Sequence, residues 1–73
     1  MNIKIWSKPQ CPYCDMAKRL LDQKGLEYTA EMLGEDFERE DVVAKFPTAR
    51  TFPIIVIDNE YIGGYNELNK RLQ

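Results

Sequence analysis

The run IIVI at residues 54–57 constrains the fold more than any other part of this sequence. Its four side chains are apolar and β-branched at consecutive positions, without the alternation of a strand that has one face in water. Such a run is typical of a strand that is buried on both faces. The chain is therefore expected to cover both sides of a sheet that contains this strand.

The residues after this run predict a hairpin and a short helix. An Asp-Asn pair at 58–59 favours a tight turn into a strand at residues 60–62. A Gly-Gly pair at 63–64 then precedes YNELNKRL at residues 65–72, which we interpret as a last short helix.

The N-terminal part of the chain predicts two strands with a helix between them. Residues 2–7 alternate around two isoleucines, and residues 26–32 alternate apolar with polar side chains, which is the period of a strand. Between them, residues 12–24 have helical periodicity, with Pro12 suited to the first position and Gly25 to the end. A helical wheel predicts one apolar face, made of Tyr13, Met16, Ala17, Leu20 and Leu21.

A second helix is predicted at residues 34–46. Its acidic residues come first and Lys45 comes near its end, which suits the helix dipole, and Pro47 prevents continuation. Phe37 falls opposite Val42, Val43 and Phe46 on the wheel, so the apolar face is irregular. We interpret the acidic run from residue 35 to residue 41 as a solvated helix face.

These elements alternate in an order that predicts an α/β fold, βαβαββα. The first two strands are expected to be parallel, joined by a right-handed crossover, and the last two to form an antiparallel hairpin. The result is a four-stranded mixed sheet flanked by helices.

Length and composition predict a soluble domain of ordinary type. A chain of 73 residues has room for one core, so residues 1–73 are interpreted as a single domain. The hydrophobic fraction of 44% and net charge of -2 argue against disorder and against nucleic acid or an anionic membrane as a general partner. No signal peptide or membrane-spanning run is seen, so we expect a cytoplasmic protein with reduced thiols.

The two cysteines of the chain, Cys11 and Cys14, allow three interpretations. A disulfide that closes so short a loop would stabilise the fold by only about 2 kcal/mol. A structural zinc site normally needs four Cys or His ligands, and this chain has two cysteines and no histidine, so only a metal or iron–sulfur cluster shared between chains remains. The third interpretation is a reactive pair of thiols.

Position favours the reactive pair. Cys11 lies where a loop enters the predicted helix, so unpaired N–H groups and the helix dipole favour its thiolate and lower its pKa from about 8.5. Lys8 acts in the same direction, while Asp15 in the first turn opposes it. Cys14 falls at the edge of the apolar side. We therefore expect Cys11 to be the exposed nucleophile and Cys14 the shielded thiol that resolves a mixed disulfide.

Three motifs in this order resemble those of the dithiol glutaredoxins. They are CPYC at 11–14, ARTFP at 49–53, which is similar to the family's Thr-Val-Pro segment, and GGYNEL at 63–68, which is similar to its Gly-Gly-aromatic-Asp motif. The resemblance extends over nearly the whole chain. It implies a thioredoxin-like fold and thiol–disulfide exchange that depends on glutathione.

The resemblance also implies a binding site for glutathione. Cys11 becomes the nucleophile, Cys14 the resolving thiol, and Pro53 a cis-proline that presents the backbone of Phe52 to an extended peptide. From the residues alone, a core contact for Tyr13, a strand start at Pro53 and a turn at Gly63-Gly64 are favoured, while Lys8 is as readily a solvated charge as a binding residue. The glutathione and substrate site that the resemblance implies consists of Lys8, Tyr13, Thr51, Phe52, Pro53, Gly64, Tyr65 and Asn66.

Three further residues bear on the predicted ligand. Asn66 replaces the family's Asp, whose charge pairs with the ligand's amino group, and Glu67 is expected to substitute for it in part. Lys45 and Arg50 join Lys8 as candidates to bind the glycine carboxylate of glutathione.

The predicted function is reduction of protein disulfides and glutathione mixed disulfides, with glutathione as reducing cosubstrate and no bound metal. Expected partners are glutathione and disulfide-containing or glutathionylated proteins, with ribonucleotide reductase as one candidate, and the chain is expected to be a monomer. One alternative is a redoxin that thioredoxin reductase reduces and that donates electrons to ribonucleotide reductase. Another is a non-enzymatic iron–sulfur carrier.

Overall fold

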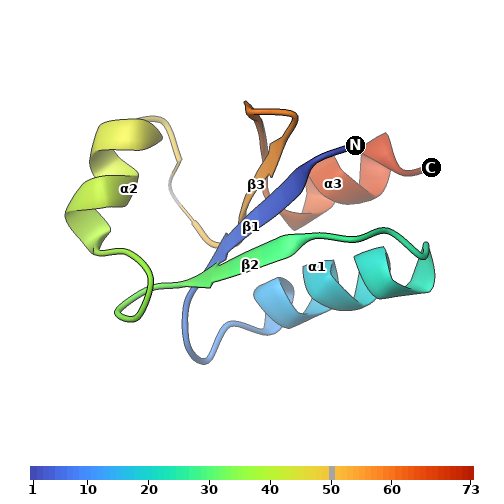
Figure 1. Ribbon diagram of the computed structural model, residues 1–73, viewed down its shortest axis with the longest axis horizontal. Coiled ribbons are helices and arrows are strands. Elements are labelled where there is room, and N and C mark those ends of the chain that lie inside the picture. The colour runs from blue at the N-terminus through green and yellow to red at the C-terminus, as the bar shows by residue number, and fades with distance from the viewer. Residues whose placement is uncertain (50) are drawn as a thin grey trace.

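The computed structural model describes residues 1–49 and 51–73 and has the predicted order of elements (Figure 1). They are β1 (Ile3–Ser7), α1 (Pro12–Gln23), β2 (Thr29–Met32), α2 (Arg39–Lys45), β3 (Ile54–Ile57), β4 (Glu60–Gly63) and α3 (Tyr65–Arg71).

One mixed sheet with the strand order β2-β1-β3-β4 forms the centre of the molecule. β1 and β2 are parallel, while β1 with β3 and β3 with β4 are antiparallel, as predicted. The positive φ angles of Asp58 and Asn59, 51° and 68°, suit a tight hairpin turn between β3 and β4. The predicted βαβαββα topology is thus confirmed.

The sheet is covered on both faces, as the IIVI run requires. α1 and α3 contact each other and pack on one face (Figure 1), where they bury Ile3, Ile5, Ile55 and Ile57 with Ala17, Leu21 and Leu68. The other face carries a second core, called here the aromatic core, made of Trp6, Phe37, Val42, Phe46 and Ile54. Side chains of β1 and β3 alternate between the two cores, so β3 is apolar throughout.

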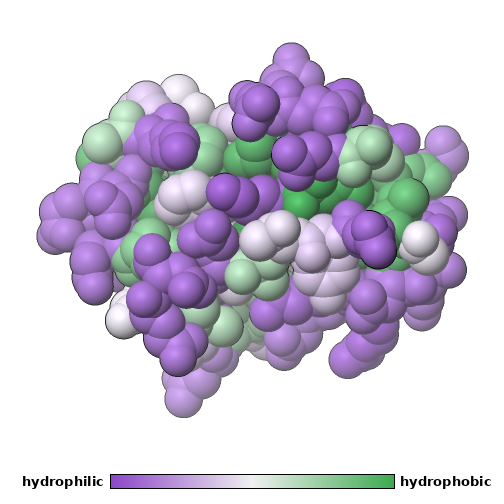
Figure 2. Space-filling view, viewed as in Figure 1, coloured by the Kyte–Doolittle hydropathy of each residue, from purple (hydrophilic) through white to green (hydrophobic). Residues whose placement is uncertain are grey.

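Polar residues cover most of the face seen in Figure 2, and hydrophobic residues show only between them. Among the described residues, no helix is long and apolar enough to cross a membrane.

The second helix begins at Arg39 and not at residue 34, which corrects the prediction. Gly34 has a φ of +90°, its N–H donates to the Phe37 carbonyl (2.8 Å), and the Glu38 N–H donates to Asp41 Oδ2 (2.8 Å). These contacts form a turn and then cap a helix that starts one residue later. Phe37 therefore precedes the helix and is buried in the aromatic core, so the acidic run is not one solvated helix face.

Two other expectations need correction. The second strand begins at Thr29, because the Leu26 N–H donates to the Leu21 carbonyl (3.0 Å) in the turn that ends α1. On α1, the buried residues are Cys14, Ala17 and Leu21. Tyr13 and Met16 are 57% and 39% exposed, so the wheel placed the apolar face too far around the helix.

Candidate active site

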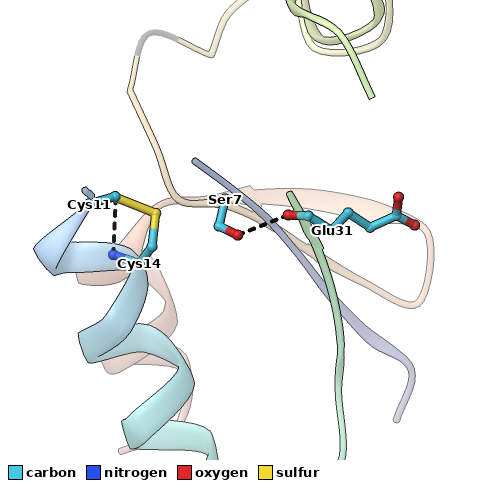
Figure 3. Close-up of a disulfide and its surroundings, with 4 residues drawn as sticks. All are labelled: Ser7, Cys11, Cys14 and Glu31. Atoms are coloured by element: carbon cyan, nitrogen blue, oxygen red, sulfur yellow. Dashed lines mark hydrogen bonds between the residues drawn. A yellow bond between two sulfur atoms is a disulfide. The ribbon is translucent and has the colours of Figure 1, made fainter. Parts of the chain in front are cut away.

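The site begins where the carboxyl end of β1 leads through a short loop into α1. Cys11 has an extended backbone (φ -123°, ψ 96°) and is the N-cap of α1, with Pro12 at the first helical position. The Cys14 N–H donates to Cys11 Sγ at 3.2 Å (Figure 3). The sulfur of Cys11 thus accepts one of the hydrogen bonds that the start of a helix leaves open.

The two cysteines form a disulfide across the first turn of α1 (Figure 3), with their Cα atoms 5.2 Å apart. Cys11 is 7% exposed and Cys14 is 1% exposed. The expectation of an exposed Cys11 is wrong for this oxidised state, because only a small part of the residue is accessible to solvent. Cys11 is nevertheless the more accessible of the two, as predicted, and Cys14 lies against the core.

Cys11 forms part of the wall of a cavity of about 380 Å³, called here the Cys11 cavity. The cavity has two cationic side chains and, among the described residues, no carboxylate. Its walls are made of Lys8, Gln10, Cys11, Pro12, Tyr13, Arg39, Thr51 and Phe52.

Arg39 is a site residue that the sequence analysis missed. A helix starting at residue 34 would place it in the middle of a solvated face, but it is the first residue of α2 and faces the Cys11 cavity. The signal that could have revealed it is the acidic pair Glu38 and Asp41, spaced as helix-capping residues are.

A second cavity of about 690 Å³ shares Tyr13, Thr51 and Phe52 with the first. We call it the α3 groove, because the start of α3 forms one wall. The two cavities together contain Cys11 and all eight residues of the glutathione and substrate site that the resemblance implies. The α3 groove is lined by Tyr13, Thr48, Thr51, Phe52, Pro53, Tyr61, Ile62, Gly63, Gly64, Tyr65, Asn66 and Glu67.

A larger cavity of about 850 Å³ lies at the other end of β1 and is lined in part by Asn2 and Tyr28. It contains neither cysteine, so the two smaller cavities are the candidate site.

The Phe52–Pro53 peptide bond is cis, as the resemblance implies. A Cβ atom placed on Gly64 would lie 3.3 Å from the Pro53 carbonyl oxygen, so the start of α3 approaches the proline loop closely. Tyr13 and Tyr65 face each other across the groove with ring centroids 6.1 Å apart. The exposed Tyr13 is therefore a wall of the site and not a core residue.

Glu67 binds to the helix start of its own chain. Its Oε1 accepts the Gly64 N–H at 2.7 Å, and this hydrogen bond is the main reason that the pKa of the Glu67 carboxyl lies below its ordinary value of 4.5. The Glu67 carboxylate thus already has a hydrogen-bond partner within the protein. That it takes over in part the role of the family's Asp stays a prediction.

The three predicted cations differ in position. Lys8 lines the Cys11 cavity, with its Nζ 6.0 Å from the centroid of the Phe52 ring. The prediction for Lys45 is wrong, because its Nζ lies 5.6 Å from the centroid of Trp6 and lines a separate cavity with Lys4. α2 carries Lys45 at the end opposite Arg39. Arg50 lies outside the described residues.

Within residues 1–49 and 51–73, no group of three or more His, Cys, Asp or Glu side chains is arranged to hold a metal ion. The chemistry that the site offers is that of its two sulfur atoms. One sulfur lies at a helix start and lines a cavity that also contains two cations, and the other is bonded to it across the first turn of the helix.

Comparisons with known proteins agree with this site. The family model for glutaredoxin matches residues 3–62. Glutaredoxin 3 of Escherichia coli (strain K12) is 34% identical over 67 residues, which cover 92% of this chain and 81% of the relative.

Two solved structures have the same thioredoxin-like fold. Glutaredoxin 1 from Francisella tularensis, complexed with cacodylate, has a TM-score of 0.81 and 26% identity, covering 97% of this chain and 91% of that one. A buckwheat glutaredoxin–glutathione complex has a TM-score of 0.82 and 27% identity, covering 96% and 66%. The chain therefore belongs to the glutaredoxin family of thiol–disulfide oxidoreductases.

Proposed function

We propose that this protein uses glutathione to reduce protein disulfides and glutathione mixed disulfides, with Cys11 as nucleophile and Cys14 as resolving thiol. The observation that carries the proposal is the position of Cys11 Sγ. It accepts an N–H at the start of α1 and lies in the wall of a cavity that contains two cations. Both features favour a negative charge on this sulfur.

The reaction begins when the Cys11 thiolate attacks a substrate disulfide. A bond forms between Cys11 Sγ and one substrate sulfur, and the other substrate sulfur leaves as a thiolate that takes up a proton. Cys14 then loses its proton and attacks Cys11 Sγ, which releases the second substrate thiol and leaves the Cys11–Cys14 disulfide. Two electrons have passed from the protein to the substrate.

Glutathione restores the dithiol in two further exchanges. A first glutathione thiolate attacks Cys11 Sγ, because Cys11 borders a cavity and Cys14 is almost fully buried. Cys14 leaves as a thiol, and Cys11 carries the glutathione. A second glutathione thiolate attacks the glutathione sulfur, which frees the Cys11 thiolate and produces glutathione disulfide.

The two adjoining cavities suit a tripeptide with carboxylates at both ends. Lys8 and Arg39 in the Cys11 cavity would bind one carboxylate, and the α3 groove would receive the other end between Tyr13 and Tyr65. The backbone N–H and C=O of Phe52 would pair with the extended part of the ligand. The buckwheat relative, whose structure is that of a glutathione complex, supports this choice of ligand.

Substitution of each cysteine tests the assignment of roles. Cys14→Ser should retain reduction of a glutathionylated peptide, which requires only Cys11, and should lose reduction of a protein disulfide. Cys11→Ser should lose both activities. Full activity of Cys11→Ser with either substrate would contradict the proposed roles.

The source of electrons needs a separate test. The reduced protein should turn over with glutathione and glutathione reductase at least ten times faster than with thioredoxin reductase. The opposite preference would favour the redoxin that thioredoxin reductase reduces. That outcome would leave the roles of the two cysteines intact.

We further propose that the protein acts as a cytoplasmic monomer, since a reducing compartment keeps Cys11 available as a thiol. Ribonucleotide reductase is a candidate protein substrate. Sedimentation of the reduced protein and a direct assay with oxidised ribonucleotide reductase test these two statements.

A further inference from the structure

Lys8 is the cation whose position near Cys11 most needs an explanation. It lies in an exposed loop, and among the described residues it makes no ion pair. Its long side chain would ordinarily lose much conformational freedom on being fixed. Its Nζ lies 6.0 Å from the centroid of the Phe52 ring, within the range of a cation–π contact, and both side chains line the Cys11 cavity.

The Phe52 ring is itself fixed from behind. It stacks on Phe37 with ring centroids 6.3 Å apart and an interplanar angle of 24°. Phe37 in turn packs on Trp6 at 4.7 Å, and both of these residues are buried in the aromatic core. The three rings thus form a column that extends from the core to the mouth of the Cys11 cavity and presents a ring to Lys8.

Several charged or titratable groups surround Cys11. Lys8 and Arg39 line its cavity with Tyr13, and Asp15 lies in the first turn of α1. Arg39 is carried by α2, whereas Lys8 depends on its own loop and on Phe52. The charge of Lys8 at the cavity therefore depends on the ring more than that of Arg39 does.

We propose that Phe52 is a positioning residue that acts through its side chain. Its ring keeps the Lys8 ammonium at the Cys11 cavity, where the positive charge favours the Cys11 thiolate and attracts anionic substrates. This role is separate from the backbone contacts of Phe52, and it rests on the proposed function of Cys11 as nucleophile. An exposed cation–π contact changes the equilibrium constant between Lys8 held at the cavity and Lys8 extended into solvent by roughly two- to five-fold.

The test measures the electrostatic field at one sulfur atom. In a reduced Cys14→Ser background, Cys11 is alkylated with iodoacetate, which is anionic, and with iodoacetamide, which is neutral and of similar size. Both rates are followed across a pH series at low salt. At high pH, where Cys11 is fully ionised, the ratio of the iodoacetate rate to the iodoacetamide rate reports the positive charge near Cys11. A loss of packing alone would not change this ratio.

Phe52→Leu keeps an apolar contact with Phe37 and removes the ring face. We expect the iodoacetate to iodoacetamide ratio to fall roughly two-fold, and at most about five-fold. Phe46→Leu is the matched control, because Phe46 packs on Trp6 in the same aromatic core at 5.2 Å and does not line the Cys11 cavity. For Phe46→Leu, the iodoacetate to iodoacetamide ratio should equal that of the parent. Trp6 fluorescence checks that both variants are folded.

Lys8→Met, alone and combined with Phe52→Leu, completes a double-mutant cycle. It should lower the ratio by itself, and Phe52→Leu should then have no further effect. The inference is overturned if Phe52→Leu leaves the ratio unchanged. It is also overturned if Phe52→Leu lowers the ratio as much in the Lys8→Met background as in the parent, or if Phe46→Leu lowers the ratio as much as Phe52→Leu does. If Cys11 of the parent instead titrates as an ordinary thiol, the failure lies in the proposed function and not in the role of Phe52.

Discussion

Substitution by alanine should have different effects at Gly63 and Gly64, the two adjacent glycines before α3. Gly63 has a φ of +126°, a conformation that L side chains rarely adopt, whereas Gly64 has a φ of -109°, which any residue can adopt. A Cβ on Gly63 would lie 2.5 Å from Cγ of Glu67, and a Cβ on Gly64 would lie 3.3 Å from the Pro53 carbonyl oxygen. Gly63→Ala should therefore destabilise the fold, and Gly64→Ala should act on the site.

The backbone conformation sets the magnitude for Gly63→Ala. A side chain forced into this region costs about 1–3 kcal/mol. The Glu67 side chain must also move, and it then loses its hydrogen bond to the Gly64 N–H. For Gly64→Ala, the entropy that alanine removes from the unfolded chain is worth about 0.4–1 kcal/mol and offsets the tight contact with Pro53. Its net change should lie within about 1 kcal/mol of zero.

Urea unfolding of the reduced proteins, followed by Trp6 fluorescence, measures both changes. With a slope of about 1 kcal/mol per molar urea, Gly63→Ala should lower the midpoint by about 1–3 M. In a Glu67→Ala background the loss should be smaller but should persist, since the strained φ remains. Gly64→Ala should instead raise KM for glutathione, because it displaces the Pro53 loop. A larger loss of stability for Gly64→Ala than for Gly63→Ala would refute this reasoning.

Three other substitutions test separate contacts. Glu67→Gln should reduce the acid sensitivity of folding. The lowered pKa of Glu67 gives stability that is present above its ordinary value of 4.5 and is lost as pH falls through the folded value, so the two proteins should converge in denaturant midpoint at low pH. Ser7→Ala removes a buried hydroxyl that donates to the Glu31 carbonyl at 2.8 Å, and should lower the unfolding free energy by about 1 kcal/mol; an unchanged free energy would contradict that contact. Lys45→Met should leave KM for glutathione unchanged while Lys8→Met raises it, and equal effects would show that the separation of the two lysines is wrong.

The order and pairing of the elements could be predicted because they depend on local periodicity. The IIVI strand must be buried on both faces of the sheet, and the other segments have the apolar periodicity of a strand or of a helix. The predicted start of α2 is too early, because a run of acidic residues suits a helix start at several positions. Hydrogen bonds at Gly34, Glu38 and Asp41 select one of them. Phe37, which fitted no helical face, belongs to the turn before the helix.

Site residues that belong to a local sequence motif could be predicted, and those whose position depends on tertiary packing could not. CPYC placed both cysteines, because the start of a helix follows from local sequence. A helical wheel gives the width of an apolar face but not its rotation toward the sheet, so it predicts burial for Tyr13 and Met16, which are exposed. Arg39 and Lys45 lie at opposite ends of one short helix, and only the docking of α2 decides which end reaches Cys11.

The pH dependence of Cys11 alkylation tests the central claim most directly. The reduced Cys14→Ser variant is reacted with iodoacetamide from acid to alkaline pH, and the midpoint of the rate is the pKa of the Cys11 thiol. The helix start and the two neighbouring cations predict a midpoint well below about 8.5, the value of a free cysteine. A midpoint at about 8.5 or above would contradict the account.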